Sequence, residues 1–304
     1  MIPAAARKAK IFYVGLLSLC AVITCHPCFA QQTSVYHVGL VAHDSKEEVL
    51  KSWQPTVDYL SQHIPGATFE IVPVEARQFH DRTIFNNMDF IIANPPISVE
   101  LTYFHNVRRI ASITREFEGR EFDYYGGVII ARADRDDIQS LADLRGKRFV
   151  AVNAYSFGGW LSSLAEFQKS GLNPYRDFSQ QAYLGSHRAV LFEVLEGKAD
   201  AGIVETGVLE ELNNEGQISL GDLKVLNPKT FYKRENGTKE KLPFLCSTEL
   251  FPEWSIVAMP GVSDEIAKKV TMELFAMGKN DPAAKAGGYA QWVVPHNYSK
   301  VSQY

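Results

Sequence analysis

Small and polar residues follow a buried strand near the middle of the chain. Residues 149–152 form a continuous apolar run that predicts the strand, and Ser156 then lies where a helix N-cap is expected. Gly158 and Gly159 leave the first helical turn without side chains, so a bound group can come close to the unpaired backbone N–H groups. Such a turn can bind an anion. Alternatively, Ser156 only caps the helix and binds nothing.

The same arrangement is predicted at three further turns. Asn94, Ser186 and Thr206 each follow an apolar run and precede a helical pattern. In an open α/β sheet, the carboxyl ends of the strands form the crevice in which ligands bind. Four helix N-termini, each with a partial positive charge, would favour an oxyanion there. Capped helices are common in α/β proteins, however, so the pattern also fits a protein without an anion site.

Short apolar runs alternate with amphipathic segments along most of the chain, which predicts an α/β fold of the parallel type. The predicted helix at 47–62 has an apolar stripe, a second helix is expected at about 77–85, and residues 115–123 are predicted to be a polar loop. The strands are predicted at residues 35–41, 69–72, 90–93, 107–114, 127–132, 149–152, 181–184 and 199–204.

The first 30 residues have the pattern of an export signal. Three basic residues precede the apolar stretch 11–24, and a pattern of small residues ends at Ala30. Cleavage would make Gln31 the first residue and deliver the protein to the periplasm. The alternative is an uncleaved membrane anchor, although the apolar stretch is shorter than the roughly 20 residues that a membrane-spanning helix needs.

The charge balance argues against nucleic acid as a partner. The chain has 31 Lys and Arg against 35 Asp and Glu, which gives a net charge of −4. Three of the basic residues lie in the export segment, so the exported chain would have 28 against 35 and a net charge of −7. An acidic protein is repelled by nucleic acid and by anionic membranes.

Cys246 is the single cysteine that follows the export segment, so the sequence predicts no intramolecular disulfide. A lone thiol in an oxidising compartment is expected to be either buried or used. Its use would be contact with the sulfane sulfur of a sulfur oxyanion such as tetrathionate or thiosulfate.

Motifs of catalysis and cofactor binding are absent from the sequence. It contains no Gly-x-Ser-x-Gly, no His-Glu-x-x-His, no Walker loop and no Gly-x-Gly-x-x-Gly. The pairs His43-Asp44 and His80-Asp81 are too short to indicate a metal site. We therefore predict a protein without catalysis, cofactor or metal.

The sequence resembles the phosphonate-type (PhnD-like) periplasmic binding proteins, a branch of the type 2 periplasmic binding fold, over nearly all of the exported chain. The motifs of the resemblance are residues 125–132, 140–147, 156–159, 185–187 and 197–201. Residues 246–254 and 292–295 are more similar to the periplasmic part of tetrathionate-type sensor kinases. The resemblance implies a two-lobed α/β clamshell, each lobe a sheet flanked by helices, that closes on a small oxyanion without catalysis.

The resemblance also implies roles for single residues. Tyr125 matches an aromatic ligand contact between the lobes, and the alternative for it is core packing. Ser156 and the amides of Phe157 and Gly158 match the anion-binding turn. His187 matches a histidine ligand contact, for which we expect tighter binding at mildly acidic pH if the imidazolium form binds the ligand.

Glu205 matches an acidic or polar residue that meets the far end of the ligand. Because a carboxylate repels a compact anion, the resemblance implies that Glu205 is protonated or paired, or that the ligand also carries a cationic or hydrogen-donating group. Asn94, Thr206 and Cys246 complete the set of predicted ligand-binding residues.

The predicted anion turn departs from the phosphonate binders. Phe157 and Gly158 replace two residues expected to carry anion-binding hydroxyl groups. Fewer hydroxyls suit a soft, weakly hydrated anion better than a phosphate group, so the departure puts phosphonate specificity in doubt.

The sequence leaves two functions open. One is the solute receptor of an ABC transporter for phosphate, phosphite or phosphonate, whose partner is a membrane permease. The other is the ligand-sensing periplasmic component of a two-component system, whose partner is a membrane sensor kinase. The lobes are predicted at residues 31–132 with 257–304 for the first, and at residues 133–256 for the second.

Overall fold

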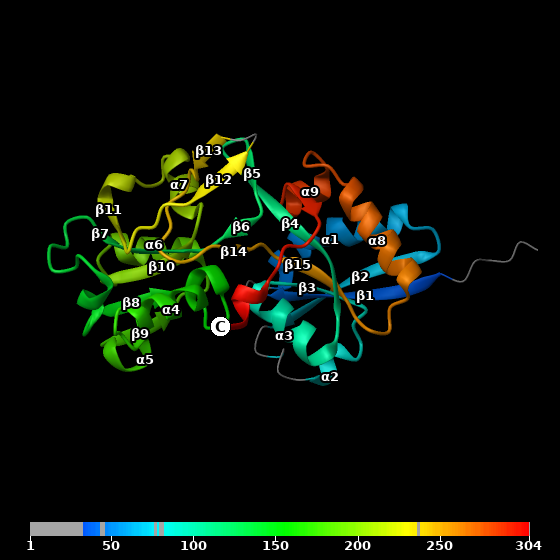
Figure 1. Cartoon of the computed structure of the whole chain (residues 1–304), viewed down its shortest axis with the longest axis horizontal. Coiled ribbons are helices and arrows are strands. Elements are labelled where there is room, and N and C mark those ends of the chain that lie inside the picture. The colour runs from blue at the N-terminus through cyan, green and yellow to red at the C-terminus, as the bar shows by residue number, and fades with distance from the viewer. Residues whose placement is uncertain (1–32, 43–45, 76–77, 79–81, 236–237, 304) are drawn as a thin grey trace, which may run out of the picture. The chain divides into compact units, whose positions relative to one another are not determined.

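The computed structural model describes residues 33–42, 46–75, 78, 82–235 and 238–303. The predicted export segment 1–30 and the pairs His43-Asp44 and His80-Asp81 lie outside these residues. Two large β-sheets, each with its own helices, and two sheets of two short strands make up the described chain (Figure 1). The predicted two-lobed α/β architecture is confirmed.

The first sheet combines strands from the two ends of the chain. Its order is β16-β4-β15-β3-β1-β2, with β5 paired to β4. Only β1 pairs in parallel with its neighbours β2 and β3, whereas β15 and β16 are antiparallel to theirs. The sheet is therefore mixed, whereas the alternation of strands and helices predicted a parallel type. The strands are β1 (Ser34–Ala42), β2 (Ala67–Glu75), β3 (Phe90–Ala93), β4 (Arg108–Phe117), β5 (Arg120–Phe122), β15 (Ser255–Ala258) and β16 (Gln291–Val293).

Helices from both chain ends cover the first sheet. The apolar stripe of α1 (Lys46–His63) includes Val49, Trp53, Val57 and Leu60, which are buried against the sheet. The C-terminal helices α8 (Asp264–Ala276) and α9 (Pro282–Gly287) lie beside α1 (Figure 1). The short helix α2 (Arg82–Phe85) and α3 (Pro95–His105) flank β3 in the sequence, and α3 contacts β3, β4 and β15.

The second sheet has the order β11-β7-β10-β8-β9, and its inner strands are buried on both faces. Along β7, Val128 and Ile130 face one apolar cluster, while Ile129 and Ala131 face the other. This explains the continuous apolar runs in the sequence, because neither face of these strands meets water. The strands are β7 (Gly127–Arg132), β8 (Arg148–Ala151), β9 (Gln180–Tyr183), β10 (Ala201–Glu205) and β11 (Leu223–Leu226).

Helices cover both faces of the second sheet. Phe167 of α4 (Ser162–Lys169) belongs to one apolar cluster. Val190 of α6 (His187–Leu195) and Leu209 of α7 (Val208–Asn214) belong to the other. A short helix, α5 (Pro174–Asp177), precedes β9. Among the described helices, none combines the length and apolar character that crossing a membrane requires.

Two short paired strands connect the sheets. β6 (Tyr124–Tyr125) runs antiparallel to β14 (Phe251–Pro252). The predicted polar loop at 115–123 is wrong in this region, because β4 extends to Phe117 and forms a hairpin with β5. The predicted lobe boundary at 132 is also shifted, since β7 pairs within the second sheet. A separate hairpin, β12 (Tyr232–Glu235) with β13 (Thr238–Lys241), precedes β14 in the chain.

Candidate functional site

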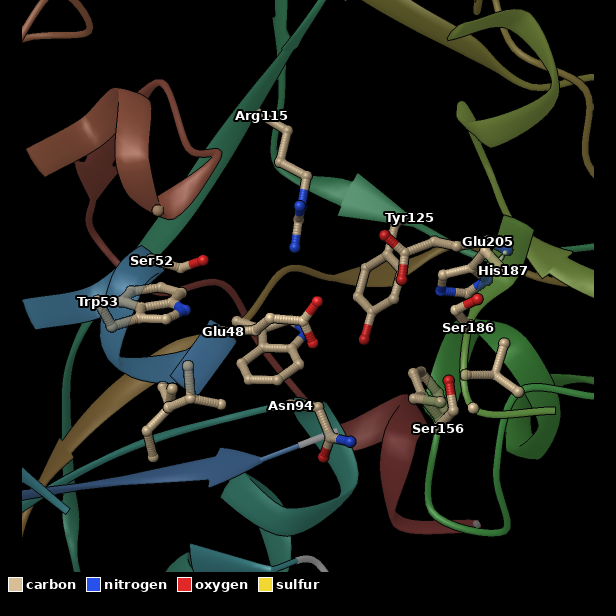
Figure 2. A pocket seen from close by; sticks show the side chains of 18 residues that line it. Glu48, Ser52, Trp53, Asn94, Arg115, Tyr125, Ser156, Ser186, His187 and Glu205 are labelled. Atoms are coloured by element: carbon tan, nitrogen blue, oxygen red, sulfur yellow. Dashed lines mark hydrogen bonds between the residues drawn. The ribbon is translucent and has the colours of Figure 1, made fainter. Parts of the chain in front are cut away.

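One pocket brings together residues of both sheets (Figure 2). Its volume is about 310 Å³. Glu48, Ser52 and Trp53 of α1 line it from the first sheet's helices, and Ser156 and His187 line it from the second sheet. The other lining residues are Leu40, Val49, Asn94, Arg115, Tyr125, Val152, Phe157, Gly158, Gly185, Ser186, Glu205, Trp254 and Gly287. Seven of the nine predicted ligand-binding residues thus lie on one cavity, while Thr206 and Cys246 do not.

The turn after β8 has the predicted cap, but the first turn of the predicted helix is π-helical rather than α-helical. The Ser156 hydroxyl accepts a hydrogen bond from the Gly159 amide at 3.2 Å. Residues 157–161 then form a π-helical turn before α4 begins at Ser162. The Phe157 and Gly158 amides lie in this first turn, where a helix supplies no acceptor of its own. Single π-helical turns are frequent at functional sites, so this geometry agrees with an anion-binding turn.

Gly158 is required here by space. A Cβ atom on Gly158 would lie 2.8 Å from Glu205 Oε2 and 2.9 Å from Glu205 Cγ. The Glu205 side chain therefore packs directly against the turn that is predicted to bind the anion. Phe157 points instead into an apolar cluster with Tyr125 and Phe251, and its ring centroid is 4.8 Å from that of Phe251.

Asn94 caps α3 as predicted and also reaches the second sheet's side of the pocket. Its Oδ1 accepts a hydrogen bond from the Ile97 amide at 3.2 Å. Its Nδ2 donates to the Tyr155 carbonyl at 3.2 Å, one residue before Ser156. Since the Asn94 side chain is 1% exposed, it holds the two turns against each other at the edge of the pocket.

Ser186 caps α6 through the Ala189 amide at 3.1 Å and places His187 in the pocket wall. The Glu205 amide donates to His187 Nδ1 at 3.1 Å, so Nδ1 is unprotonated and the proton of the neutral ring lies on Nε2. Burial, aided by the charge of Arg115, lowers the pKa of His187 to about 4. The lowered pKa favours the neutral ring over the imidazolium, so His187 can offer a neutral N–H donor.

Thr206 is not a helix cap. Gly207, with a φ of 91°, occupies the N-cap position of α7. The Thr206 hydroxyl instead accepts a hydrogen bond from the Gly126 amide at 3.1 Å, next to the connection between the sheets. Thr206 lines a neighbouring cavity of about 680 Å³ rather than the pocket. The prediction that Thr206 caps a fourth anion-binding turn is therefore wrong.

Cys246 is buried rather than presented to the pocket. It is 1% exposed, and its thiol donates to the Thr248 carbonyl at 3.3 Å. Burial raises the pKa of the thiol to about 11, which keeps it protonated at neutral pH. The predicted contact of a Cys246 thiolate with a ligand finds no support in this geometry, whereas the alternative of burial is confirmed.

Arg115 is a charged pocket residue that sequence analysis missed. Its Nε lies 3.1 Å from Oε1 of Glu253, which is 2% exposed. Burial lowers the pKa of Arg115, but the nearby charges of Glu253 and Glu205 outweigh this effect and raise it, so Arg115 stays cationic. Burial raises the pKa of Glu253 to about 7 in spite of Arg115, and the charge of Glu205 adds to the increase.

Tyr125 points its hydroxyl into the pocket (Figure 2). The residue is 3% exposed, and its hydroxyl has no hydrogen-bond partner among the described residues. A buried hydroxyl without a partner costs free energy, which a ligand atom in the pocket can recover. Burial raises the pKa of Tyr125 well above its ordinary value, so the phenol is a donor at every physiological pH.

Comparison of the sequence and the structure with known proteins agrees with this geometry. A family described as "ABC transporter, phosphonate, periplasmic substrate-binding protein" matches residues 38–298. The chain belongs to this family. Among solved structures, XAC2383 from Xanthomonas citri bound to ATP has a TM-score of 0.67 at 17% identity, covering 89% of this chain and 96% of that one. PhnD1 from Prochlorococcus marinus in complex with methylphosphonate has a TM-score of 0.64 at 16% identity, covering 89% and 96%. These likenesses confirm the type 2 periplasmic binding fold.

A sensor protein is more similar to this chain in sequence than these solved proteins are. The tetrathionate sensor histidine kinase TtrS of Salmonella typhimurium is 32% identical over 296 residues, which are 97% of this chain. The match covers 45% of TtrS, so this chain spans less than half the length of that relative. The description of the matched family is that of periplasmic substrate-binding proteins.

Proposed function

We propose that this protein is a periplasmic receptor that binds a small oxyanion in the pocket between its two sheets and releases it unchanged. The observation that carries the proposal is the convergence of three capped turns, at Asn94, Ser156 and Ser186, on one cavity. The turns at Ser156 and Ser186 offer backbone amides, whereas the turn at Asn94 begins with Pro95 and Pro96 and contributes only its helix dipole. Arg115, the Tyr125 hydroxyl and the His187 N–H supply further donors on the same cavity. Several donors of this kind are what an oxyanion with three or more oxygens requires.

The absence of catalysis is part of the proposal. A hydrolytic site needs a nucleophile next to a base. Here the Ser156 and Ser186 hydroxyls accept hydrogen bonds from helix amides, and His187 Nδ1 is occupied by the Glu205 amide. These groups are arranged to hold a ligand rather than to transfer its protons.

The ligand class is a soft oxyanion. Phe157 and Gly158 offer amides but no hydroxyl groups at the turn, and the large aromatic side chains Trp53 and Trp254 line the pocket. Such walls favour a weakly hydrated anion over a compact, strongly hydrated one. PhnD1 was solved in complex with methylphosphonate, and the name of TtrS contains tetrathionate. Phosphorus oxyanions and sulfur oxyanions are therefore the two ligand classes to test.

The test is calorimetry with phosphite, methylphosphonate, thiosulfate and tetrathionate. Saturable binding of at least one of them, lost in Arg115→Gln, is the expected result. Failure of all four to bind the folded protein would contradict the proposal.

Sensing is the second candidate, and one observation favours it. Identity to TtrS is 32% over nearly the whole chain, about twice that to the solved periplasmic binding proteins at 16–17%. In this case the ligand-bound protein would signal to a membrane kinase instead of delivering cargo to a permease. Deletion of the chromosomal gene separates the two candidates, because loss of oxyanion-dependent transcription with normal uptake indicates a sensor.

Export and lobe closure complete the proposal. Cleavage after Ala30 should give a periplasmic protein that begins at Gln31, which N-terminal sequencing of the periplasmic fraction can check. The lobes, formed by the first and second sheets with their helices, should close around the ligand because the closed state provides more contacts. Small-angle scattering should show compaction when the ligand binds, and no compaction despite measured binding would contradict it.

A further inference from the structure

The charges around the pocket do not balance in favour of an anion. Arg115 is the one cationic side chain among the described residues that line it, whereas Glu48 and Glu205 bring two carboxylates. Glu253, paired with Arg115, adds a third. Glu205 and Glu253 alone exceed the charge of Arg115 by one when both are ionised. An oxyanion that enters must overcome this charge.

Glu205 is the carboxylate that lies next to the turn predicted to bind the anion. Its carboxylate packs against Gly158 in the anion turn, with Oε2 2.8 Å from the position of a Cβ. It forms no hydrogen bond with any described residue. An ionised carboxylate at this place repels an anion held by the turn, whereas a protonated carboxyl group can donate a hydrogen bond to it.

We propose that Glu205 determines the specificity of the site by carrying a proton whenever an oxyanion is bound, so that the ligand and one proton from solvent bind together. The inference rests on the proposed function. The proton adds to a Glu205 oxygen, no covalent bond of the ligand changes, and the carboxyl O–H points at the anion. The site then prefers oxyanions that are fully deprotonated acceptors over ligands that must themselves donate.

The surroundings of Glu205 support this proton. On the pocket side Glu205 faces Arg115 of β4, Tyr125 of β6, His187 of α6 and Glu48 of α1. His187 stays neutral above about pH 4 and Tyr125 stays protonated, so neither takes up the proton near neutral pH. Glu253, whose pKa is raised to about 7, is the competing group, but its carboxylate is paired with Arg115 instead of packing against the anion turn. On the other side, Glu205 lines the neighbouring cavity with Glu116, Glu118, Glu211, Glu215 and Glu253. Burial raises the pKa of Glu205, with Arg115 acting in the opposite direction.

Titration calorimetry of the whole protein with thiosulfate and tetrathionate tests the inference. Both probes remain dianions between about pH 5.5 and about pH 8, so any proton that is taken up belongs to the protein. Measurements in two buffers of different ionisation enthalpy should give an uptake of about one proton per bound anion. The affinity should fall by roughly tenfold per pH unit above the pKa of the group that takes up the proton.

Variants assign the proton. Glu205→Gln retains a donor, so its affinity should lose the pH dependence and exceed that of the wild type by about tenfold or more near pH 8. Glu48→Gln is the matched control, because it removes a carboxylate from the opposite wall and should keep the pH dependence. Thermal unfolding shows whether each variant is folded, and the two-buffer measurement needs only the wild type.

Each outcome decides the inference. Binding without proton uptake, or a pH dependence that persists in Glu205→Gln, overturns it while the proposed function stands. If an aminoalkylphosphonate binds and none of the four plain oxyanions does, Glu205 pairs with the ammonium group of the ligand. This outcome also overturns the inference. If no oxyanion binds the folded wild type or Glu205→Gln at either pH, the proposed function fails and the inference fails with it.

Discussion

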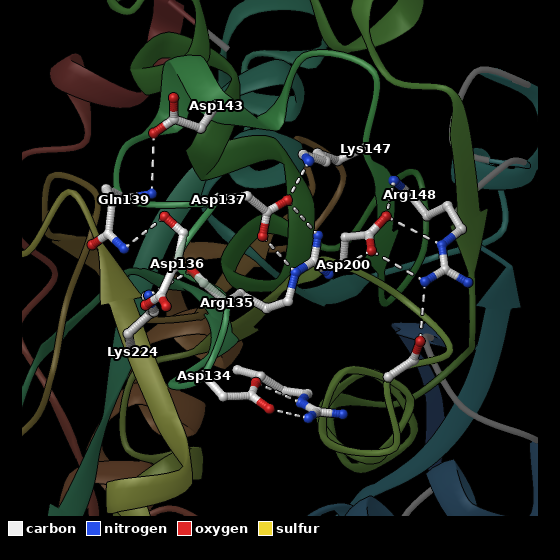
Figure 3. Close-up of polar contacts among 12 residues, drawn as sticks. Asp134, Arg135, Asp136, Asp137, Gln139, Asp143, Lys147, Arg148, Asp200 and Lys224 are labelled. Atoms are coloured by element: carbon white, nitrogen blue, oxygen red, sulfur yellow. Dashed lines mark hydrogen bonds and ion pairs between the residues drawn. The ribbon is translucent and has the colours of Figure 1, made fainter.

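Two groups of charged residues in this protein are built in opposite ways. At the edge of the second sheet, Asp137 contacts Arg135 and Lys147, and Asp200 contacts Arg135 and Arg148 (Figure 3). Each carboxylate there has two cationic partners, and their hydrogen bonds hold the pKa of Asp137 and of Asp200 well below the ordinary value. We call these five residues the edge cluster.

The second group, Arg115, Glu205 and Glu253, is the pocket cluster. A single guanidinium serves two carboxylates, and burial raises the pKa of both. In the edge cluster, cationic partners compensate each carboxylate. The pocket cluster has one carboxylate more than it has cations. An unbalanced, partly buried cluster costs stability and is retained where a ligand completes it.

The largest expected effect follows from removing the one cation of the pocket cluster. Arg115→Gln should weaken anion binding by at least ~3 kcal/mol, since a charged donor is lost and Glu253 is left without its partner. The free energy of unfolding should fall by about 2 kcal/mol near pH 8, less than for a fully buried pair, because Glu253 can take up a proton. Chemical denaturation and calorimetry measure the two effects.

The double variant Arg115→Gln with Glu253→Gln is the control. It should recover most of the stability, because no buried charge remains without a partner, but it should not recover binding. A single variant as stable as the wild type at pH 8 would show that Glu253 does not depend on Arg115.

A smaller effect is expected from Gly158→Ala. The new Cβ would lie 2.8 Å from Glu205 Oε2, so the side chain or the turn must move and the amides are obstructed. Anion affinity should fall by about 2 kcal/mol, roughly 30-fold, as for the loss of one charge-assisted hydrogen bond. Gly261→Ala is the matched control, because no heavy atom lies within 4 Å of its Cβ position. Equal affinity of both variants in calorimetry would exclude the turn from the site.

The titration of His187 gives an effect of similar or lesser size. Its pKa is about 4 in the folded protein and 6.5 as the ordinary value, so its neutral form contributes stability that is present above pH 6.5 and is lost as the pH falls toward 4. The loss should be about 2 kcal/mol, since the ring is only partly shielded from water. His187→Gln should lose less stability than the wild type over that range.

The wild type alone does not isolate this effect. The raised pKa of Glu253 works in the opposite direction, because its contribution is present at acidic pH and is lost as the pH rises through about 7. The difference between wild type and variant in denaturation experiments removes the shared contribution of Glu253. If the two proteins respond alike to pH, His187 does not have a lowered pKa.

The helix caps around the pocket could be predicted, because local sequence determines them. Asn94, Ser156 and Ser186 were recognised because a cap bonds an amide three residues on, as the structure shows for all three. Thr206 was misjudged because the next residue, Gly207, takes the cap position with a positive φ, and the hydroxyl bonds Gly126 instead. The sequence around a turn does not reveal such a distant partner.

Arg115 could not be found in this way. Its partner Glu253 is 138 residues away, and the charged residues around it gave the pattern of a polar loop rather than of the β4–β5 hairpin. A pocket between two sheets also collects residues, such as Glu48 and Trp254, that no motif connects. Glu48, Ser52 and Trp53 lie on one side of α1, but the same spacing describes any helix that packs on a sheet.

The smallest effects are expected in the edge cluster, where Asp137→Asn and Asp200→Asn can be compared. The side chain of Asp137 is 50% exposed and that of Asp200 is 13% exposed, although both bind Arg135. Water and salt screen the exposed pair, so Asp137→Asn should leave the Tm unchanged within error at high salt. Asp200 also accepts from the Arg148 amide at 2.8 Å, and its loss should lower the Tm measurably at any salt concentration. Neither variant should alter anion affinity or its pH dependence; if either does, the edge cluster and the pocket cluster are coupled and the contrast drawn between them is wrong.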